Sequence, residues 1–196
     1  YTAGLSVHKL LHHGVSPEKG PILVTGATGG VGCIAVTLLA KLGFYVAAVT
    51  GKLEARKFLE DIGANEILPR EEISDTTGRG LLPGRWAGVV DTVGGHTLDC
   101  AIRQTKLEGA VASCSNVTSG ELHTSVYPFI LRGVALLGIN SAFTPMTVRQ
   151  VIWRKLATDW KFSVLNRLVT EVSLEQIDGY IDLILKGGVT GRVLVK

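Results

Sequence analysis

A glycine-rich turn near the start of the sequence has the residue types of a phosphate-binding loop. Residues 24–32 read VTGATGGVG, and they lie between a short apolar run, residues 22–25, and a stretch of helical periodicity. Glycines in such a turn let backbone N–H groups approach a pyrophosphate at the N-terminus of the following helix. Because the turn stands between a predicted strand and a predicted helix, it predicts a dinucleotide site.

The glycines of this turn are expected to have separate roles. Gly29 allows the backbone to approach the pyrophosphate, Gly30 keeps the start of the helix unobstructed, and Gly32 lets the helix pack against the strand. The usual G-x-G-x-x-G pattern begins with glycine where this sequence has Ala27, and Thr28 offers a hydroxyl to a phosphate. The alternative is a tight turn without a ligand, which so many glycines disfavour because each loses conformational entropy on folding.

The end of the second predicted strand, residues 45–49, indicates which dinucleotide binds. An NAD site usually places Asp or Glu there, about twenty residues after the glycines, to hold the ribose 2′-hydroxyl. This sequence instead has Thr50, Gly51 and Lys52. A hydrogen bond to a charged group contributes roughly 1.5–3 kcal/mol, enough to decide the choice of cofactor. The alternative is a solvated lysine on a loop, but the missing acid favours NADP(H) over NAD(H).

Further candidates follow the other predicted strands. Arg70, after the third strand, is either a second ligand of the 2′-phosphate or a surface arginine. Asp91, after the fourth, is either a catalytic acid or a residue that orders its loop, and the second role is favoured. The loops after the fifth and sixth strands are expected beside the nicotinamide ribose and the nicotinamide. They contain Asn116 and Val117, and Gly138 and Asn140.

The elements that position these residues alternate along the chain. Strands are predicted at 22–25, 45–49, 66–68, 88–91, 109–114 and 134–139, and helices at 31–42, 53–62 and 97–104. This alternation is typical of an α/β fold, a Rossmann doubly wound parallel six-stranded sheet with helices on both faces. A short helix over residues 5–11 is expected before the sheet.

The pattern changes after the sixth strand. Helices are predicted at 144–156 and 174–186, and two isolated strands at 168–172 and 192–195 are expected to add to another sheet. We therefore expect a junction helix in residues 1–16, an NADP(H)-binding domain in 17–165 and a C-terminal segment in 166–196.

The composition excludes several classes of protein. The chain has 196 residues, 46% of them hydrophobic, and a net charge of +3 without a basic stripe, so a nucleic-acid surface is not expected. No apolar stretch approaches the length of a membrane span, and no membrane partner is expected. The three cysteines predict buried thiols in a reducing cytoplasm. The five histidines form no pair with a third ligand, so no metal is expected, and no G-x-S-x-G nucleophile motif occurs.

Several segments together resemble the zinc-independent medium-chain dehydrogenases/reductases, and among them the acryloyl-CoA reductase branch, which is quinone oxidoreductase-like. They are the glycine turn, residues 50–52, 68–70, 91–94, 128–134 and 137–139, and the terminal 191–196. The resemblance implies NADPH-dependent reduction of an activated carbon–carbon double bond in an enoyl thioester. The alternatives are an NADPH:quinone oxidoreductase and a non-catalytic NADPH-binding module. A short-chain reductase is excluded, since neither Tyr127 nor Tyr180 has a lysine four residues later.

The same resemblance implies roles for individual residues. The pyrophosphate is bound by Thr28, Gly29, Gly30 and Val31, and the 2′-phosphate by Thr50, Lys52 and Arg70. The loops of Asn116 and Asn140 hold the nicotinamide. The resemblance also assigns Arg132 and Arg192 to the cofactor site, on less specific motifs. Family members begin with a GroES-like catalytic domain that this sequence lacks, so the chain resembles a piece of a longer protein. We expect this chain by itself to bind NADPH but not to turn over substrate. No catalytic residue is assigned within it, and it is compatible with a homodimer.

Overall fold

Short apolar runs form the centre of the sheet. The strands β1 (Ile22–Val24), β2 (Val46–Thr50) and β4 (Trp86–Asp91) are buried along their whole length, as is usual for parallel strands covered on both faces. In the computed structural model, which describes all 196 residues, they belong to a six-stranded sheet of order β3-β2-β1-β4-β5-β6. The remaining strands are β3 (Glu66–Pro69), β5 (Thr105–Ser113) and β6 (Ala135–Gly138), and every pairing is parallel. The predicted fold is confirmed.

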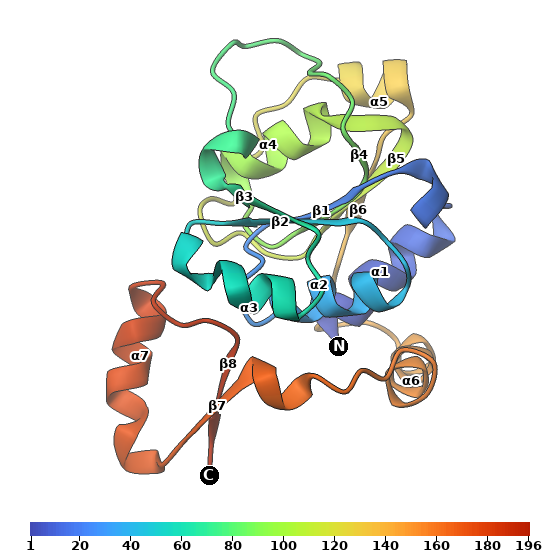
Figure 1. Cartoon of the computed structure of the whole chain (residues 1–196). Coiled ribbons are helices and arrows are strands. Elements are labelled where there is room, and N and C mark those ends of the chain that lie inside the picture. The colour runs from blue at the N-terminus through green and yellow to red at the C-terminus, as the bar shows by residue number, and fades with distance from the viewer.

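Helices cover both faces of this sheet (Figure 1). Successive residues of β1 point to opposite faces, so Ile22 and Val24 belong to one hydrophobic core and Leu23 to the other. The first core also contains residues of α1 (Thr2–His12), α2 (Gly32–Lys41), α3 (Arg56–Asp61) and α6 (Met146–Ala157). The second lies under α4 (Gly95–Arg103) and α5 (Tyr127–Arg132).

Several predicted boundaries were wrong. The helix predicted at 53–62 is divided into a 3-10 turn, Leu53–Ala55, and α3, and β5 begins at Thr105 rather than at residue 109. The helix α5 was not predicted. It has Pro128 in its first turn and ends at Gly133, whose φ of 61° is left-handed, and both are usual signals of a helix start and end. Further 3-10 turns are Pro17–Lys19, Arg70–Ile73, Leu165–Leu168 and Leu174–Gln176.

The C-terminal residues form a small unit of their own (Figure 1). The strands β7 (Val169–Val172) and β8 (Arg192–Val195) pair with each other in parallel, joined by α7 (Ile177–Leu185). The two strands therefore lie outside the six-stranded sheet, as expected, and they pair with each other because a crossover helix brings these distant segments side by side. The division at residues 16 and 165 stays a prediction. None of the helices combines the length and apolar composition that a membrane span requires.

Candidate functional site

The glycine turn joins the end of β1 to the start of α2 and is closely packed. Gly26 has a left-handed φ of 59°, and its carbonyl accepts the N–H of Gly29 at 2.9 Å. A side chain at Gly32 would overlap that same carbonyl and would lie 2.8 Å from Cα of Ala27. These neighbours are backbone atoms and cannot move aside, so the structure agrees with close packing of α2 on the strand.

A cavity of about 520 Å³ lies at the carboxyl ends of β1, β2, β3 and β4 and is bounded by this turn. Ligands of doubly wound sheets bind at this edge, and the volume is in the range of small-molecule sites. The cavity brings together many of the residues predicted from the sequence: Thr28, Gly29, Gly30, Thr50, Gly51, Lys52, Arg70, Val117 and Arg192.

The end of β2 forms a cationic part of this cavity. The Oγ1 atom of buried Thr50 accepts the Lys52 N–H at 3.0 Å and lies 3.2 Å from Oγ1 of Thr28. The guanidinium of Arg70 lies against Gly51, where a Cβ would be 2.9 Å from Nη2. No carboxylate lines the cavity, and neither Lys52 nor Arg70 takes part in an ion pair.

The pKa of Lys52 reflects this environment. Burial lowers the pKa of Lys52, the nearby Glu54 carboxylate raises it, and the Arg70 guanidinium lowers it again. Two cations that lack an ion-pair partner and border one cavity raise each other's energy, and an anion bound between them would relieve this. The residues present therefore fit a phosphate group.

The C-terminal unit closes the other side of the cavity. The N–H of Gly191 donates to the carbonyl of Thr28 at 2.8 Å, and Lys52 Nζ donates to the carbonyl of Val189 at 2.5 Å. Arg192 lies over Gly30, where a Cβ would be 2.7 Å from its Cδ. Sequence reasoning missed Val189 and the other lining residues of this unit apart from Arg192, which are Ile184, Gly187, Gly191 and Val193. Only the terminal block of the resemblance pointed toward them.

Several predicted residues do not line the cavity. Val31 and Gly32, at the end of the turn, are not among its lining residues, and Asn116 packs beside Gly94. Gly138 and Asn140, at the end of β6, are also outside it. The Gly138 carbonyl accepts from Lys9 Nζ at 2.7 Å, and Asn140 Oδ1 accepts from the N–H of Phe143 at 3.2 Å. Their part in holding the nicotinamide stays a prediction.

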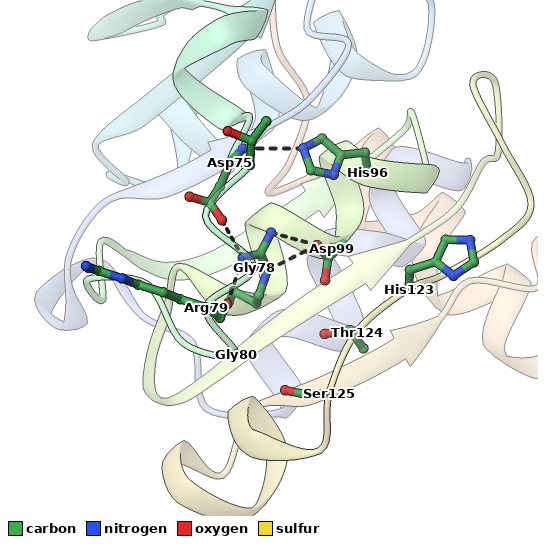
Figure 2. A pocket seen from close by; sticks show the side chains of 11 residues that line it. Asp75, Gly78, Arg79, Gly80, His96, Asp99, His123, Thr124 and Ser125 are labelled. Carbon is green, nitrogen blue, oxygen red and sulfur yellow. Dashed lines mark hydrogen bonds and ion pairs between the residues drawn. The ribbon is translucent and has the colours of Figure 1, made fainter.

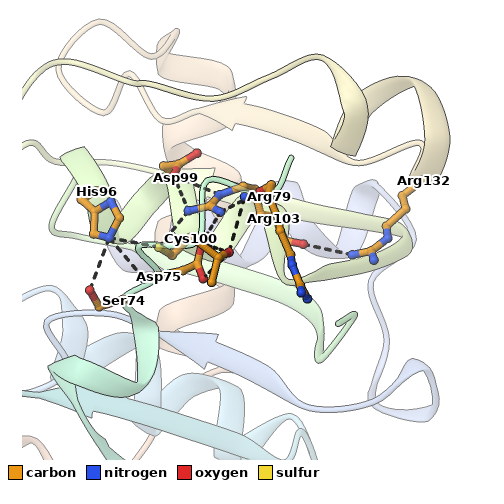
Figure 3. A network of polar contacts seen from close by, with 9 residues as sticks. Ser74, Asp75, Arg79, His96, Asp99, Cys100, Arg103 and Arg132 are labelled. Carbon is orange, nitrogen blue, oxygen red and sulfur yellow. Dashed lines mark hydrogen bonds and ion pairs between the residues drawn. The ribbon is translucent and has the colours of Figure 1, made fainter. Parts of the chain in front are cut away.

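The structure corrects the predicted role of Arg132 in binding the cofactor. Its guanidinium donates to the carbonyls of Leu82 (2.6 Å), Arg103 (3.0 Å) and Thr105 (3.0 Å). Figure 3 shows the bond from Arg132 to the Arg103 carbonyl. Thr105 begins β5, so these acceptors lie at the amino ends of the strands, the edge opposite the cofactor cavity. Arg132 therefore ties α5 to the loops around it and does not border the cavity.

Asp91, at the end of β4, orders the loop that follows. Its carboxylate accepts from Thr25 Oγ1 at 2.7 Å and from the N–H groups of Gly94 (3.0 Å) and Val93 (3.3 Å). Burial raises the pKa of this carboxyl, and the Thr25, Gly94 and Val93 hydrogen bonds lower it. These bonds support the loop-ordering role that the sequence favoured. The same loop brings Thr92 and Val93 into the cavity. Thr97 of α4 and Thr118, which follows β5, also line it.

A second hollow, of about 290 Å³, lies on the α4 side of the sheet and has no hydrophobic lining residue (Figure 2). Its lining includes Asp75, Asp99 and Arg103, which are joined by ion pairs, together with His96 and His123. It shares no lining residue with the cofactor cavity.

The sheet order, the glycine turn after β1 and the cavity at the strand ends together define a dinucleotide-binding protein of the Rossmann type. A family model described as zinc-binding dehydrogenase matches residues 30–158. The chain belongs to this family, the medium-chain dehydrogenases/reductases, and corresponds to their NAD(P)-binding domain.

Named relatives match along the whole chain. "Putative quinone oxidoreductase YhfP" of Bacillus subtilis is 47% identical, and the acrylyl-CoA reductase AcuI of Ruegeria pomeroyi is 43% identical; both alignments cover 100% of this chain. Two crystal structures also match over 100% of this chain. The YhdH oxidoreductase of Salmonella enterica in complex with NADP has 42% sequence identity and a TM-score of 0.95. YhfP with NAD bound has 48% sequence identity and a TM-score of 0.94. This chain spans 59% to 60% of the length of these proteins.

The family description mentions zinc, but the cofactor cavity of this chain does not fit that metal. None of its lining residues is Cys, His, Asp or Glu, the side chains that bind zinc in proteins. We therefore assign no step at this cavity to a metal ion.

Proposed function

We propose that this chain binds NADP(H) and is the cofactor-binding part of an enzyme that reduces an activated carbon–carbon double bond. One observation carries the choice of cofactor: β2 ends without an acid, and Lys52 and Arg70 border the cavity without an ion-pair partner. A carboxylate at this position would repel a 2′-phosphate, whereas two cations attract it.

The lining residues have distinct tasks in this proposal. Lys52, Arg70 and the Thr50 hydroxyl hold the 2′-phosphate. The backbone at Gly29 and Gly30 and the guanidinium of Arg192 hold the pyrophosphate at the N-terminal end of α2. When bound, NADPH supplies the hydride, and the protein supplies alignment and electrostatics.

The reaction class rests on the named relatives. AcuI, a relative at 43% identity, is an acrylyl-CoA reductase, and this supports an enoyl thioester as the substrate class. YhfP, at 47% identity, supports a quinone as the second candidate. A binding module without catalysis is the third candidate, because this chain spans about 60% of those relatives.

A turnover assay separates these candidates. The protein in its full length is mixed with NADPH and either acryloyl-CoA or a simple quinone, and the oxidation of NADPH is followed by absorbance. We expect oxidation that depends on acryloyl-CoA. Oxidation with the quinone alone would replace the proposal with its runner-up. Binding of NADPH without turnover of either compound would favour the non-catalytic module.

A further inference from the structure

We propose that Lys9 and Arg149 are positioning residues for the nicotinamide end of the cofactor. They hold the β6–α6 loop, residues 138–142, in one fixed conformation. Lys9 belongs to α1 and Arg149 to α6, so two helices that are distant in the sequence reach the same loop. This inference rests on the proposed function, since it takes NADP(H) as the ligand.

The topology of the sheet places this loop on the side where the second half of a dinucleotide is expected. A doubly wound sheet of this strand order consists of two mononucleotide-binding halves that meet where the order reverses. Lys52 and Arg70 follow β2 and β3, so the 2′-phosphate belongs to the first half. All six strands are parallel, so the β6–α6 loop lies at the same edge in the second half. The nicotinamide is therefore expected on the side of this loop.

Lys9 donates a hydrogen bond that the sheet itself cannot provide. The strand β6 is the outermost strand, so one of its sides has no neighbouring strand. On the paired side, the N–H of Ile139 donates to the carbonyl of Ser113 at 3.0 Å. The carbonyl of Gly138 accepts instead from Lys9 Nζ at 2.7 Å. Lys9 therefore satisfies an edge-strand carbonyl that would otherwise bind only water.

Arg149 holds the other end of the loop. Its Nη2 donates to the carbonyls of Ser141 at 2.8 Å and Ala142 at 3.4 Å. Neither Arg149 nor Lys9 forms an ion pair, so the loop carbonyls are the hydrogen-bond acceptors of both charged groups. Hydrogen bonds from a charged donor are roughly twice as strong as neutral ones, so both side chains restrain the loop.

The other carbonyls of the loop are satisfied from within the chain nearby. The carbonyl of Ile139 accepts from the N–H of Ser141 at 3.0 Å, and that of Asn140 accepts from Thr144 Oγ1 at 2.6 Å. Every carbonyl from residue 138 to residue 142 thus accepts a hydrogen bond. The N–H groups of Asn140 and Ala142 donate to no group of the protein. The loop therefore offers hydrogen-bond donors to an acceptor such as the carboxamide oxygen of nicotinamide.

These bonds matter because packing does little to order the loop. Ile139 is buried in the first core, but Gly138, Asn140 and Ala142 are exposed. A loop that is ordered before the ligand arrives loses less entropy on binding, and the affinity is higher for that reason. Without Lys9 or Arg149 the loop has more freedom. The cost is then expected only for the part of the cofactor that contacts this loop.

The test compares NADPH with adenosine 2′,5′-bisphosphate, which carries the 2′-phosphate but no nicotinamide. Both compounds are titrated by calorimetry into the full chain and into the variants Lys9→Met and Arg149→Met, which lose the charge and keep an unbranched side chain. We expect each variant to bind NADPH about threefold to tenfold more weakly, the range of one net hydrogen bond. Its affinity for the bisphosphate should not change.

The matched controls are Lys41→Met and Arg154→Met, which remove the same charges from exposed residues of α2 and α6. Both controls should bind the two compounds as the unaltered chain does. The inference is overturned if Lys9→Met and Arg149→Met keep the original ratio of the two affinities, or if the controls lose as much. An equal loss for both compounds also overturns it, because that loss reports damage to the whole fold.

These outcomes are distinct from a failure of the proposed function. If the unaltered chain binds neither compound, the NADP(H) proposal and this inference fail together. If it binds both compounds and the ratio is unchanged in Lys9→Met and Arg149→Met, the NADP(H) proposal stands. The two side chains are then structural residues without a part in cofactor binding.

Discussion

The ammonium group of Lys52 donates a hydrogen bond of 2.5 Å to the main-chain carbonyl of Val189, which is 137 residues away in the sequence. This bond joins the end of β2 to the C-terminal unit across the cofactor cavity. A lysine ammonium has three donors, so Lys52 can keep this bond while it binds a phosphate. Cofactor binding and docking of the C-terminal unit are therefore expected to support each other.

The variant Lys52→Asp should reverse the choice of cofactor. It removes the cation that attracts the 2′-phosphate and introduces the acid that holds a ribose 2′-hydroxyl in NAD sites. We expect the affinity for NADPH to fall by about tenfold to a hundredfold, the equivalent of roughly 1.5–3 kcal/mol. Titration calorimetry with both cofactors measures this.

The matched control is Lys161→Asp, which makes the same charge change at an exposed residue outside the cavity. It should leave both affinities unchanged. An equal loss of NADPH affinity in the two variants would mean that net charge, rather than the position of Lys52, governs binding.

Two arginines should separate cofactor binding from stability. Arg70 has no hydrogen bond or ion pair to lose, so Arg70→Ala should weaken NADPH binding by about tenfold and leave the midpoint of urea unfolding in place. Arg132 donates to three carbonyls, so Arg132→Ala should lower the free energy of unfolding by on the order of 1–3 kcal/mol. Its ratio of NADPH to NADH affinity should not change. The opposite pattern would return Arg132 to the cofactor site.

The variant Gly32→Ala should be strongly destabilising. Its Cβ would overlap the Gly26 carbonyl and approach Cα of Ala27, and backbone atoms cannot move aside. Overpacking of this kind typically costs about 1–3 kcal/mol. Gly138→Ala is the control, because a Cβ there has no atom within 4 Å. Urea unfolding of both variants checks the contrast, and equal stability would show that the turn adapts.

The ion pair of Asp75 predicts a dependence of stability on pH. The hydrogen bond from Arg103 holds the pKa of Asp75 below the ordinary value of 3.8, while burial raises it and Thr77 lowers it further. Because the pKa of Asp75 is lower in the folded protein than in the unfolded chain, the ionised carboxyl stabilises the fold fully above pH 3.8. This stabilisation is lost as the pH falls through the lowered pKa. Asp75→Asn should therefore be less stable than the unaltered chain at pH 7. The difference in free energy of unfolding should shrink below pH 3.8, and a difference that is constant with pH would contradict the assignment.

Much of the Rossmann sheet was predictable because its signals are local. The buried run at β1, the glycine turn and the missing acid at Lys52 are each read within a few residues. The position of Arg70 was predictable as well, since parallel strands bring their carboxyl ends to one edge.

The remaining features depend on contacts between distant segments. Pairing of β7 with β8 is set by the crossover through α7, and the place of Val189 follows from how that unit docks. Arg132 was misassigned because a motif tells nothing of the direction in which a helix presents its side chain.

The most direct test of the central claim is titration calorimetry of the unaltered chain with NADPH and with NADH. If Lys52 and Arg70 bind the 2′-phosphate, NADPH will bind at least about tenfold more tightly, a difference of about 1.4 kcal/mol or more. Equal affinities for the two cofactors would contradict the account.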